Sequence, residues 1–336
     1  MPEPEHSPLV AICGHRKSGT TLLSNLLDNH PHLAVYPIDI ALLYAYFPHF
    51  LQTNPLPDAR RKRLMRVLFD DLAERLDAFG CSAAFDVDRH RERFFSGLQD
   101  EQLGDLRALI SRLIASFQTV AGRPVESMKW SVIKETSIEI YAAEILSWFP
   151  DARFIQVLRD PRDNFAALAA GVEKHYKKLG EDRKRTLASL LQRAELGFAM
   201  ARDNQAAYGA NRYHLVRYED LAAQPEPTMR DIAAFLDIDF NPCLLQPTVL
   251  GAPTGGNSYD GIQAAGIENR NVGRWHERIA DEEAAVIEFH FADKMEAFGY
   301  SPAFDAATRR RAAAEFYKWQ NYAYFYSDRF ATAASP

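Results

Sequence analysis

ICGHRKSGTTLLSNLL, residues 12–27, determines how the start of this chain folds. The apolar run 8–13 ends at a loop that contains Gly14 and Gly19, and apolar residues recur at helical spacing over 20–27. This order predicts a buried strand, a tight loop and a helix. The two glycines let the backbone curl around an oxyanion, and the unpaired N–H groups and positive dipole end of the helix favour the same ligand. The stretch therefore predicts an anion-binding site.

The lysine of this loop does not stand where a nucleotide-kinase loop has it. In the pattern GxxxxGK[ST] the lysine follows the second glycine, whereas here Gly19 is followed by Thr20 and the lysine is Lys17. A lysine inside the loop is suited to a bridging oxygen on which charge builds up as a bond breaks. No later apolar strand ends in an aspartate with clear magnesium-binding character. The loop thus favours transfer of a group less charged than phosphoryl, held by lysines and N–H donors without a metal.

Further strands and helices give the fold class. Three apolar runs read as buried strands, and each is followed by helical periodicity: 131–134, 153–158 and 213–218. Strands of this kind form a mainly parallel sheet. We expect an α/β, P-loop-like three-layer sandwich with a central sheet flanked by helices, in a single domain over 1–336. The other expected features are a helical insertion at about 40–128, helices at 186–208 and 281–298, a flexible loop at 251–266 and a C-terminal helical segment at about 302–330.

Composition restricts the possible partners and location. The formal net charge of −6 argues against a general nucleic-acid binder, which needs a basic surface. The three cysteines show no paired spacing, so a reducing compartment is the simpler interpretation. No signal peptide and no apolar stretch of about 18 residues is present, and we predict a cytoplasmic protein with no membrane span. A C-terminal aromatic stripe suggests core packing, with a homodimer contact or a substrate wall as alternatives: Phe316, Trp319, Tyr322 and Phe325.

Five segments together resemble the sulfotransferases that use 3′-phosphoadenosine-5′-phosphosulfate (PAPS). They occur in the family's order: GHRKSGTTLLSNLLDNHP (14–31), VIKETS (132–137), RFIQVLRDPRDNFAAL (153–168), YHLVRYEDLAAQPEPTMRDIAAFLDI (213–238) and ENRNVGRWHERI (268–279). The separation of 25 residues between Lys134 and Arg159 is also close to that of the family. The resemblance implies a sulfotransferase fold and release of adenosine 3′,5′-bisphosphate as the product.

The resemblance also implies residue roles. Lys17 matches the catalytic lysine that stabilises the leaving nucleotide, and Lys134 matches a lysine that holds the sulfuryl oxygens. Arg159 matches the arginine of the 3′-phosphate, a planar group with bidentate donors, and Arg270 the late basic residue at the same phosphate. Tyr218 matches an adenine neighbour, with core packing as an equal alternative. The other loop residues expected at the phosphosulfate are Arg16, Ser18, Gly19, Thr20 and Thr21, while His15 is a weaker candidate.

Two positions depart from the family pattern. Ala167 stands where the 3′-phosphate motif has a serine, which removes a hydroxyl donor that Asn164 would have to replace. Thr136 stands where soluble small-molecule members have a histidine as the general base. Three further residues are expected in supporting roles: Arg162 in a surface or helix-start ion pair, Arg274 paired with acidic residues of the following helix, and Trp275 in packing.

The general base must therefore come from a carboxylate, because an alcohol is a poor nucleophile until its proton has an acceptor. Some branches of the family place one just after the first helix and second strand, where this chain has Asp39. A helix cap is the competing interpretation of Asp39. Glu135, next to Lys134, is the second candidate.

The acceptor is open: the sequence allows a hydroxyl or amine of a sugar, phenol, amino alcohol or peptide tyrosine. Aromatic residues after Asp39 belong either to an acceptor pocket or to the core: Tyr44, Tyr46, Phe47 and Phe50. Two alternatives to a sulfotransferase are a P-loop kinase that uses ATP and magnesium, and a catalytically silent nucleotide-binding protein of the same fold.

Overall fold

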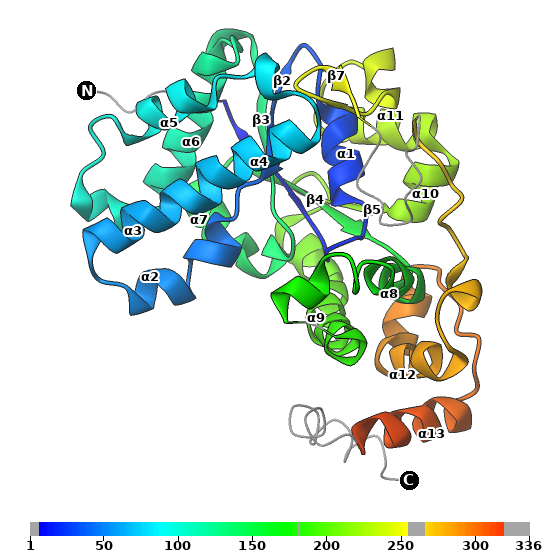
Figure 1. The fold of residues 1–336 in the computed structure, drawn as a ribbon. Helices are drawn as coiled ribbons and strands as arrows, with labels where there is room; N and C mark the ends of the chain where they lie inside the picture. The colour runs from blue at the N-terminus through cyan, green and yellow to red at the C-terminus, as the bar shows by residue number, and fades with distance from the viewer. Residues whose placement is uncertain (1–6, 181, 255–265, 319–336) are drawn as a thin grey trace.

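A five-stranded parallel sheet forms the centre of the computed structural model, which describes residues 7–180, 182–254 and 266–318 (Figure 1). The strand order is β2-β3-β1-β4-β5. The strands are β1 (Leu9–Cys13), β2 (Leu33–Asp39), β3 (Trp130–Lys134), β4 (Arg153–Leu158) and β5 (Tyr213–Arg217). The predicted fold class and the four strands expected from apolar runs are confirmed.

The edge strand β2 has a weaker sequence signal than the other strands. Its sequence LAVYPID contains Pro37, which cannot donate to a neighbouring strand and is tolerated at a sheet edge. The register against β3 shifts between Val35 and Asp39. After this irregularity Asp39 lies opposite Lys134, so the strand positions two of the expected site residues side by side.

Alternate residues of each strand face two separate cores, as expected for a sheet covered on both sides. One face packs against α1 (Thr20–Leu27), α10 (Tyr218–Ala223) and α11 (Pro225–Phe235). The other packs against α7 (Ala142–Trp148) and the helices of the insertion: α2 (His49–Thr53), α3 (Pro57–Leu64), α4 (Asp71–Ala78), α5 (Val87–Phe95), α6 (Leu106–Val120) and the π-helical turns η1 (Leu42–Tyr46) and η2 (Met65–Asp70). The predicted insertion is thus helical and packed on the sheet.

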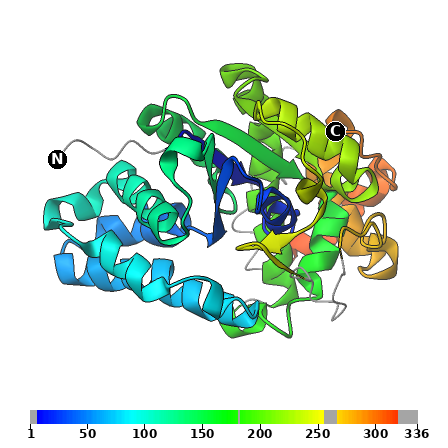
Figure 2. The same ribbon diagram turned by 90° about the horizontal axis from the view of Figure 1, so that it is seen from above.

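A third core lies at the carboxyl end of β4. It joins α8 (Pro161–Ala169), α9 (Arg183–Tyr208), α12 (Asp281–Ala297) and α13 (Ala306–Tyr317). Figures 1 and 2 both show the insertion on one side of the molecule and α12 and α13 on the other. The carboxyl ends of β1, β3 and β4 share one edge of the parallel sheet, which is where open α/β sheets bind ligands.

The structure describes only parts of the loop expected at 251–266 and of the C-terminal aromatic stripe. The predicted loop at 251–266 is wrong at its start, because Ala252–Pro253 forms β7 and pairs antiparallel with β6 (Thr248–Val249). Residues 255–265 lie outside the described part of the chain, as do Trp319, Tyr322 and Phe325 of the aromatic stripe. Phe316 packs against the third core. Within the described ranges, no helix has the length and apolar character needed to cross a membrane.

Candidate active site

The glycine-rich loop between β1 and α1 has a backbone that only glycine fits at two positions. Gly14 has φ 131°, and a Cβ there would lie 2.4 Å from the carbonyl oxygen of Val157. Gly19 has φ 110°, and a Cβ there would lie 2.5 Å from the ring of Tyr218. Lys17 also has a positive φ, 64°, between these glycines. The loop is therefore held tightly against β4 and the start of α10, with α1 beginning at Thr20 directly after it.

A buried carboxylate holds the start of the loop through a hydrogen bond to its backbone. Glu139, in the short 3-10 helix η6 (Ile138–Tyr141), accepts a 3.1 Å hydrogen bond from the Gly14 backbone N–H. Burial raises the pKa of Glu139 to about 7 because the charged form loses its hydration. Sequence reasoning missed this residue. Its only signal is a glutamate inside the apolar run IEI, just after the Lys134 strand.

An amide on α8 supports the middle of the loop. The Asn164 side chain donates to the Arg16 carbonyl oxygen at 2.9 Å, and its oxygen lies 2.7 Å from His15 Nδ1. Asn164, the candidate to compensate for the missing serine at Ala167, has both ends of its amide in contact with the loop. Burial lowers the pKa of His15 to about 3, which keeps this imidazole neutral. The His15–Asn164 pair thus positions the loop backbone.

Arg159 connects three of the expected nucleotide-binding segments. One guanidinium nitrogen donates to the Lys17 carbonyl oxygen at 2.8 Å, and another donates to the Asn271 carbonyl oxygen at 2.9 Å. The guanidinium also lies over the ring of Tyr218, 4.3 Å from its centre. Arg159 Nε is buried and has no hydrogen-bond partner among the described residues. The structure thus brings Lys17, Arg159 and Tyr218 together.

Asp39 and Lys134 form an ion pair at the ends of two neighbouring strands. Lys134 Nζ lies 2.6 Å from Asp39 Oδ2. The Lys134 side chain is only 3% exposed, whereas that of Asp39 is 45% exposed. Asp39 Oδ1 is buried and has no hydrogen-bond partner among the described residues. Asp39 is the last residue of β2, and the cap position of the following turn is Ala41. The helix-cap interpretation of Asp39 is therefore wrong.

The Glu135 carboxylate is hydrogen-bonded to backbone N–H groups. Its two oxygens accept hydrogen bonds from the N–H groups of Leu43, at 3.1 Å, and Tyr44, at 2.5 Å. The residue is 1% exposed, and burial raises its pKa to about 8. This geometry suits a residue that holds the segment after β2 in place.

Arg162 and Trp275 form a buried contact at the start of α8. The Arg162 guanidinium pairs with Asp160 at 2.6 Å and with Glu288 of α12 at 2.7 Å. It also lies 4.6 Å from the centre of the Trp275 ring. The expected helix-start ion pair is present, but it is buried, so the surface alternative is wrong. Trp275 packs as expected.

The basic segment at 268–279 contains two ion pairs between residues close in sequence. Arg270 pairs with Glu268, and its side chain is 35% exposed. Arg274 pairs with Glu277 at 2.6 Å. Glu277 belongs to the short 3-10 helix η9 (Trp275–Glu277), which directly follows Arg274. Asn271 is the residue of this segment that meets Arg159.

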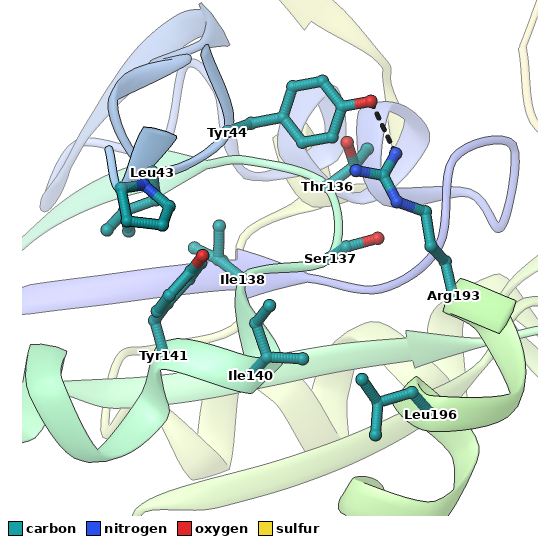
Figure 3. Close-up of a pocket in the computed structure, with 10 residues that line it drawn as sticks. Leu43, Tyr44, Thr136, Ser137, Ile138, Ile140, Tyr141, Arg193 and Leu196 are labelled. Carbon is teal, nitrogen blue, oxygen red and sulfur yellow. Dashed lines mark hydrogen bonds between the residues drawn. The ribbon is translucent and has the colours of Figure 1, made fainter. Parts of the chain in front are cut away.

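A pocket of about 190 Å³ opens beside the loop that follows Lys134. Figure 3 shows Tyr44 and Arg193 meeting near Thr136 and Ser137, with Ile140 and Leu196 on the other side. The Ser137 backbone N–H donates to the Gly14 carbonyl oxygen at 2.9 Å, which joins the pocket floor to the glycine-rich loop.

The aromatic residues after Asp39 divide between this pocket and the core. Tyr44 lines the pocket and is 53% exposed, whereas Tyr46 is fully buried in the core. Phe47 and Phe50 are partly buried against the same core. Arg193 of α9 was missed from the sequence because it stands in a long amphipathic helix with no local motif.

Comparisons with known proteins agree with this architecture. The model of the Sulfotransferase family matches residues 8–242. Carbohydrate sulfotransferase 3 of Mus musculus is 30% identical over 173 residues, which is 47% of this chain and 36% of the relative. The Homo sapiens protein of that name is 30% identical over 176 residues, covering 47% of this chain and 35% of the relative. The chain thus aligns with about a third of the length of these curated relatives.

Two solved structures share the fold. The sulfotransferase domain from the curacin biosynthetic pathway gives a TM-score of 0.54 at 17% identity, covering 88% of this chain and 98% of the domain. The sulfotransferase domain from the Synechococcus PCC 7002 olefin synthase gives 0.51 at 19% identity, covering 89% and 98%.

Proposed function

The chain belongs to the sulfotransferase family, and we propose that it transfers a sulfuryl group from PAPS to a hydroxyl or amine of an acceptor, releasing adenosine 3′,5′-bisphosphate. The family membership predicted from five sequence segments is confirmed. The observation that carries the proposed activity is the meeting of two groups at one edge of the sheet. These are the lysine-containing loop after β1 and the Asp39–Lys134 ion pair at the ends of β2 and β3.

The nucleotide side of the proposed site fits an anionic ligand. Gly14 and Gly19 let the loop pack closely against the Val157 carbonyl and the Tyr218 ring, and the buried Ser18 hydroxyl has no partner among the described residues. We assign the 5′-phosphosulfate to this loop, with Arg16, Thr20 and Thr21 as further donors. Arg159 and Arg270 would bind the 3′-phosphate, and Tyr218 would pack near adenine. The Ala167 position supplies no hydroxyl for that phosphate.

The acceptor side supplies the chemistry of proton removal. Asp39 takes the proton from the acceptor hydroxyl as the acceptor oxygen forms its bond to sulfur. The bond between sulfur and the bridging phosphate oxygen breaks in line with this attack, and the electron pair stays on that oxygen. Lys17 stabilises the resulting negative charge, and Lys134 holds both Asp39 and the sulfuryl oxygens. Glu135 keeps the segment after Asp39 in place through Leu43 and Tyr44.

Calorimetry with adenosine 3′,5′-bisphosphate tests the nucleotide part of this proposal. We expect binding in the micromolar range that needs no magnesium. Preference for ATP with magnesium would support the kinase alternative, and absence of binding would contradict the proposed activity. A screen of hydroxylated and amino acceptors with labelled PAPS, read by mass shift, then separates an active enzyme from a silent nucleotide-binding protein.

Two expectations on the state of the protein remain part of the proposal. A reducing, cytoplasmic compartment is supported by the free thiols of Cys13, Cys81 and Cys243. Imaging of a fluorescent fusion in the source cells tests it, and transit through an oxidising compartment would contradict it. A homodimer is tested by light scattering at micromolar concentration.

A further inference from the structure

The pocket beside Thr136 has an apolar mouth, which is unusual on this surface. Among the described residues, four large hydrophobic side chains are exposed: Tyr44, Leu56, Ile140 and Leu196. Three of these line this pocket, with exposed fractions of 53% for Tyr44, 36% for Ile140 and 46% for Leu196. Their clustering at one opening marks a binding surface for an apolar group, whereas scattered exposed apolar residues need no such explanation.

Arg193 is the charged residue among those that line this pocket. It donates to the Tyr44 hydroxyl oxygen at 2.5 Å, and its guanidinium lies 4.5 Å from the centre of the Tyr44 ring (Figure 3). Among residues 7–180, 182–254 and 266–318, no carboxylate forms an ion pair with Arg193. Glu195, two residues along α9, pairs instead with Lys294 at 2.8 Å. The Arg193 guanidinium thus donates to a neutral hydroxyl. A carboxylate in the same place would accept stronger, charge-assisted hydrogen bonds.

The pocket also adjoins the proposed reaction centre. Thr136 and Ser137 follow the Lys134–Glu135 pair directly, and Glu135 holds the backbone of Leu43 and Tyr44 on the opposite wall. Burial raises the pKa of Glu139, and the positive charge of Arg193 acts against this rise. The pocket therefore lies next to the segment that carries Lys134 and Glu135.

We propose that this pocket takes a small amphipathic acceptor with an apolar body and an anionic group, and that Arg193 selects it by replacing its contact to Tyr44 with a bidentate contact to that anion. The inference rests on the proposed sulfuryl transfer, because it places the acceptor hydroxyl at Asp39. The volume of about 190 Å³ is below the roughly 300–1,000 Å³ of drug-sized sites, so the pocket accommodates a small molecule or one end of a longer one.

Matched acceptors test this selection. Two pairs share a body and differ in the anion: 6-hydroxyhexanoate with 1-hexanol, and 3-(4-hydroxyphenyl)propanoate with 4-propylphenol. We expect the wild-type enzyme to prefer the anionic member of each pair by about tenfold or more in kcat/KM, since hydrogen bonds to a charged group are the stronger ones. Arg193→Gln should remove most of this preference, and Arg193→Lys should restore only part of it because lysine lacks the planar fork.

A second measurement separates this inference from the proposed activity. Calorimetry follows the binding of the four acceptors to the enzyme saturated with adenosine 3′,5′-bisphosphate. Arg202→Gln, an exposed arginine on the same helix, serves as the control and should keep the wild-type preference. The inference is overturned if the anionic members bind no better than the neutral ones, or if Arg193→Gln weakens both members equally. Failure of the nucleotide itself to bind would instead contradict the proposed activity.

Discussion

The two halves of the proposed site are built in different ways. On the nucleotide side, the loop is held mainly through backbone groups: Glu139 contacts the Gly14 N–H, and Arg159 and Asn164 contact the carbonyl groups of Lys17 and Arg16. On the acceptor side, side chains from distant segments meet directly, as in the contacts of Asp39 with Lys134 and of Tyr44 with Arg193. A backbone cradle suits a ligand common to a whole family. Side-chain contacts can change without disturbing the sheet, which suits acceptors that differ among members.

Lys17 gives the largest expected effect on the nucleotide side. Lys17→Ala should lower kcat by about a thousandfold, because the charge on the departing oxygen loses its main stabilising group. Thermal unfolding should stay near that of the wild type, since the residue lies in a loop and not in the core. Lys62→Ala, an exposed lysine of α3, is the control. Retention of more than a tenth of the wild-type kcat would contradict the assigned role.

Asp39 and Glu135 give the next contrast, on the acceptor side. Asp39→Asn should lower kcat about a hundredfold or more, because the acceptor proton loses its base, while nucleotide binding stays close to wild type. Glu135→Gln should have a smaller effect, since an amide oxygen can still accept from the Leu43 or Tyr44 backbone. Steady-state kinetics and calorimetry on both variants check this. Full activity in Asp39→Asn with loss in Glu135→Gln would reverse the assignment.

Gly14 tests how strongly the loop depends on its backbone. Gly14→Ala should lower the free energy of unfolding by about 3 kcal/mol or more and abolish nucleotide binding, because the new Cβ meets the Val157 carbonyl. Gly97 is a matched control, since it also has a positive φ, 70°, but no atom lies within 4 Å of an added Cβ. Gly97→Ala should cost about 1 kcal/mol from backbone strain alone. Chemical denaturation measures the free energy of unfolding of both variants. Equal losses would show that the backbone at Gly14 shifts and avoids the contact between the added Cβ and the Val157 carbonyl.

The same contrast explains which features could be predicted from the sequence. The loop, β4 and the helix after it are encoded by contiguous patterns, so Lys17 and Arg159 could be placed from local motifs. Lys134 and Asp39 came from family spacing, and their ion pair depends on the register across the irregular strand β2. Arg193 and Glu139 had no such signal, because each acts through partners from other segments. Those contacts are set by the tertiary packing of α9 and η6 and not by local sequence.

Glu139 gives the smallest expected effect, and it appears as a pH dependence of stability. Its pKa rises from 4.5 to about 7 on folding because burial disfavours the charged form. The folded state therefore binds more protons than the unfolded state between these values, and this contribution to stability falls as the pH rises from 4.5 through 7. Glu139→Gln removes this dependence and keeps an oxygen that can accept from the Gly14 N–H. Relative to the wild type, the free energy of unfolding of the variant should increase by on the order of 2 kcal/mol as the pH rises across that range.

Chemical denaturation at pH 5 and pH 8 measures this increase, and Glu101→Gln, at an exposed glutamate, is the control. A constant difference between variant and wild type at both pH values would show that Glu139 keeps the same protonation state in the folded and unfolded chains.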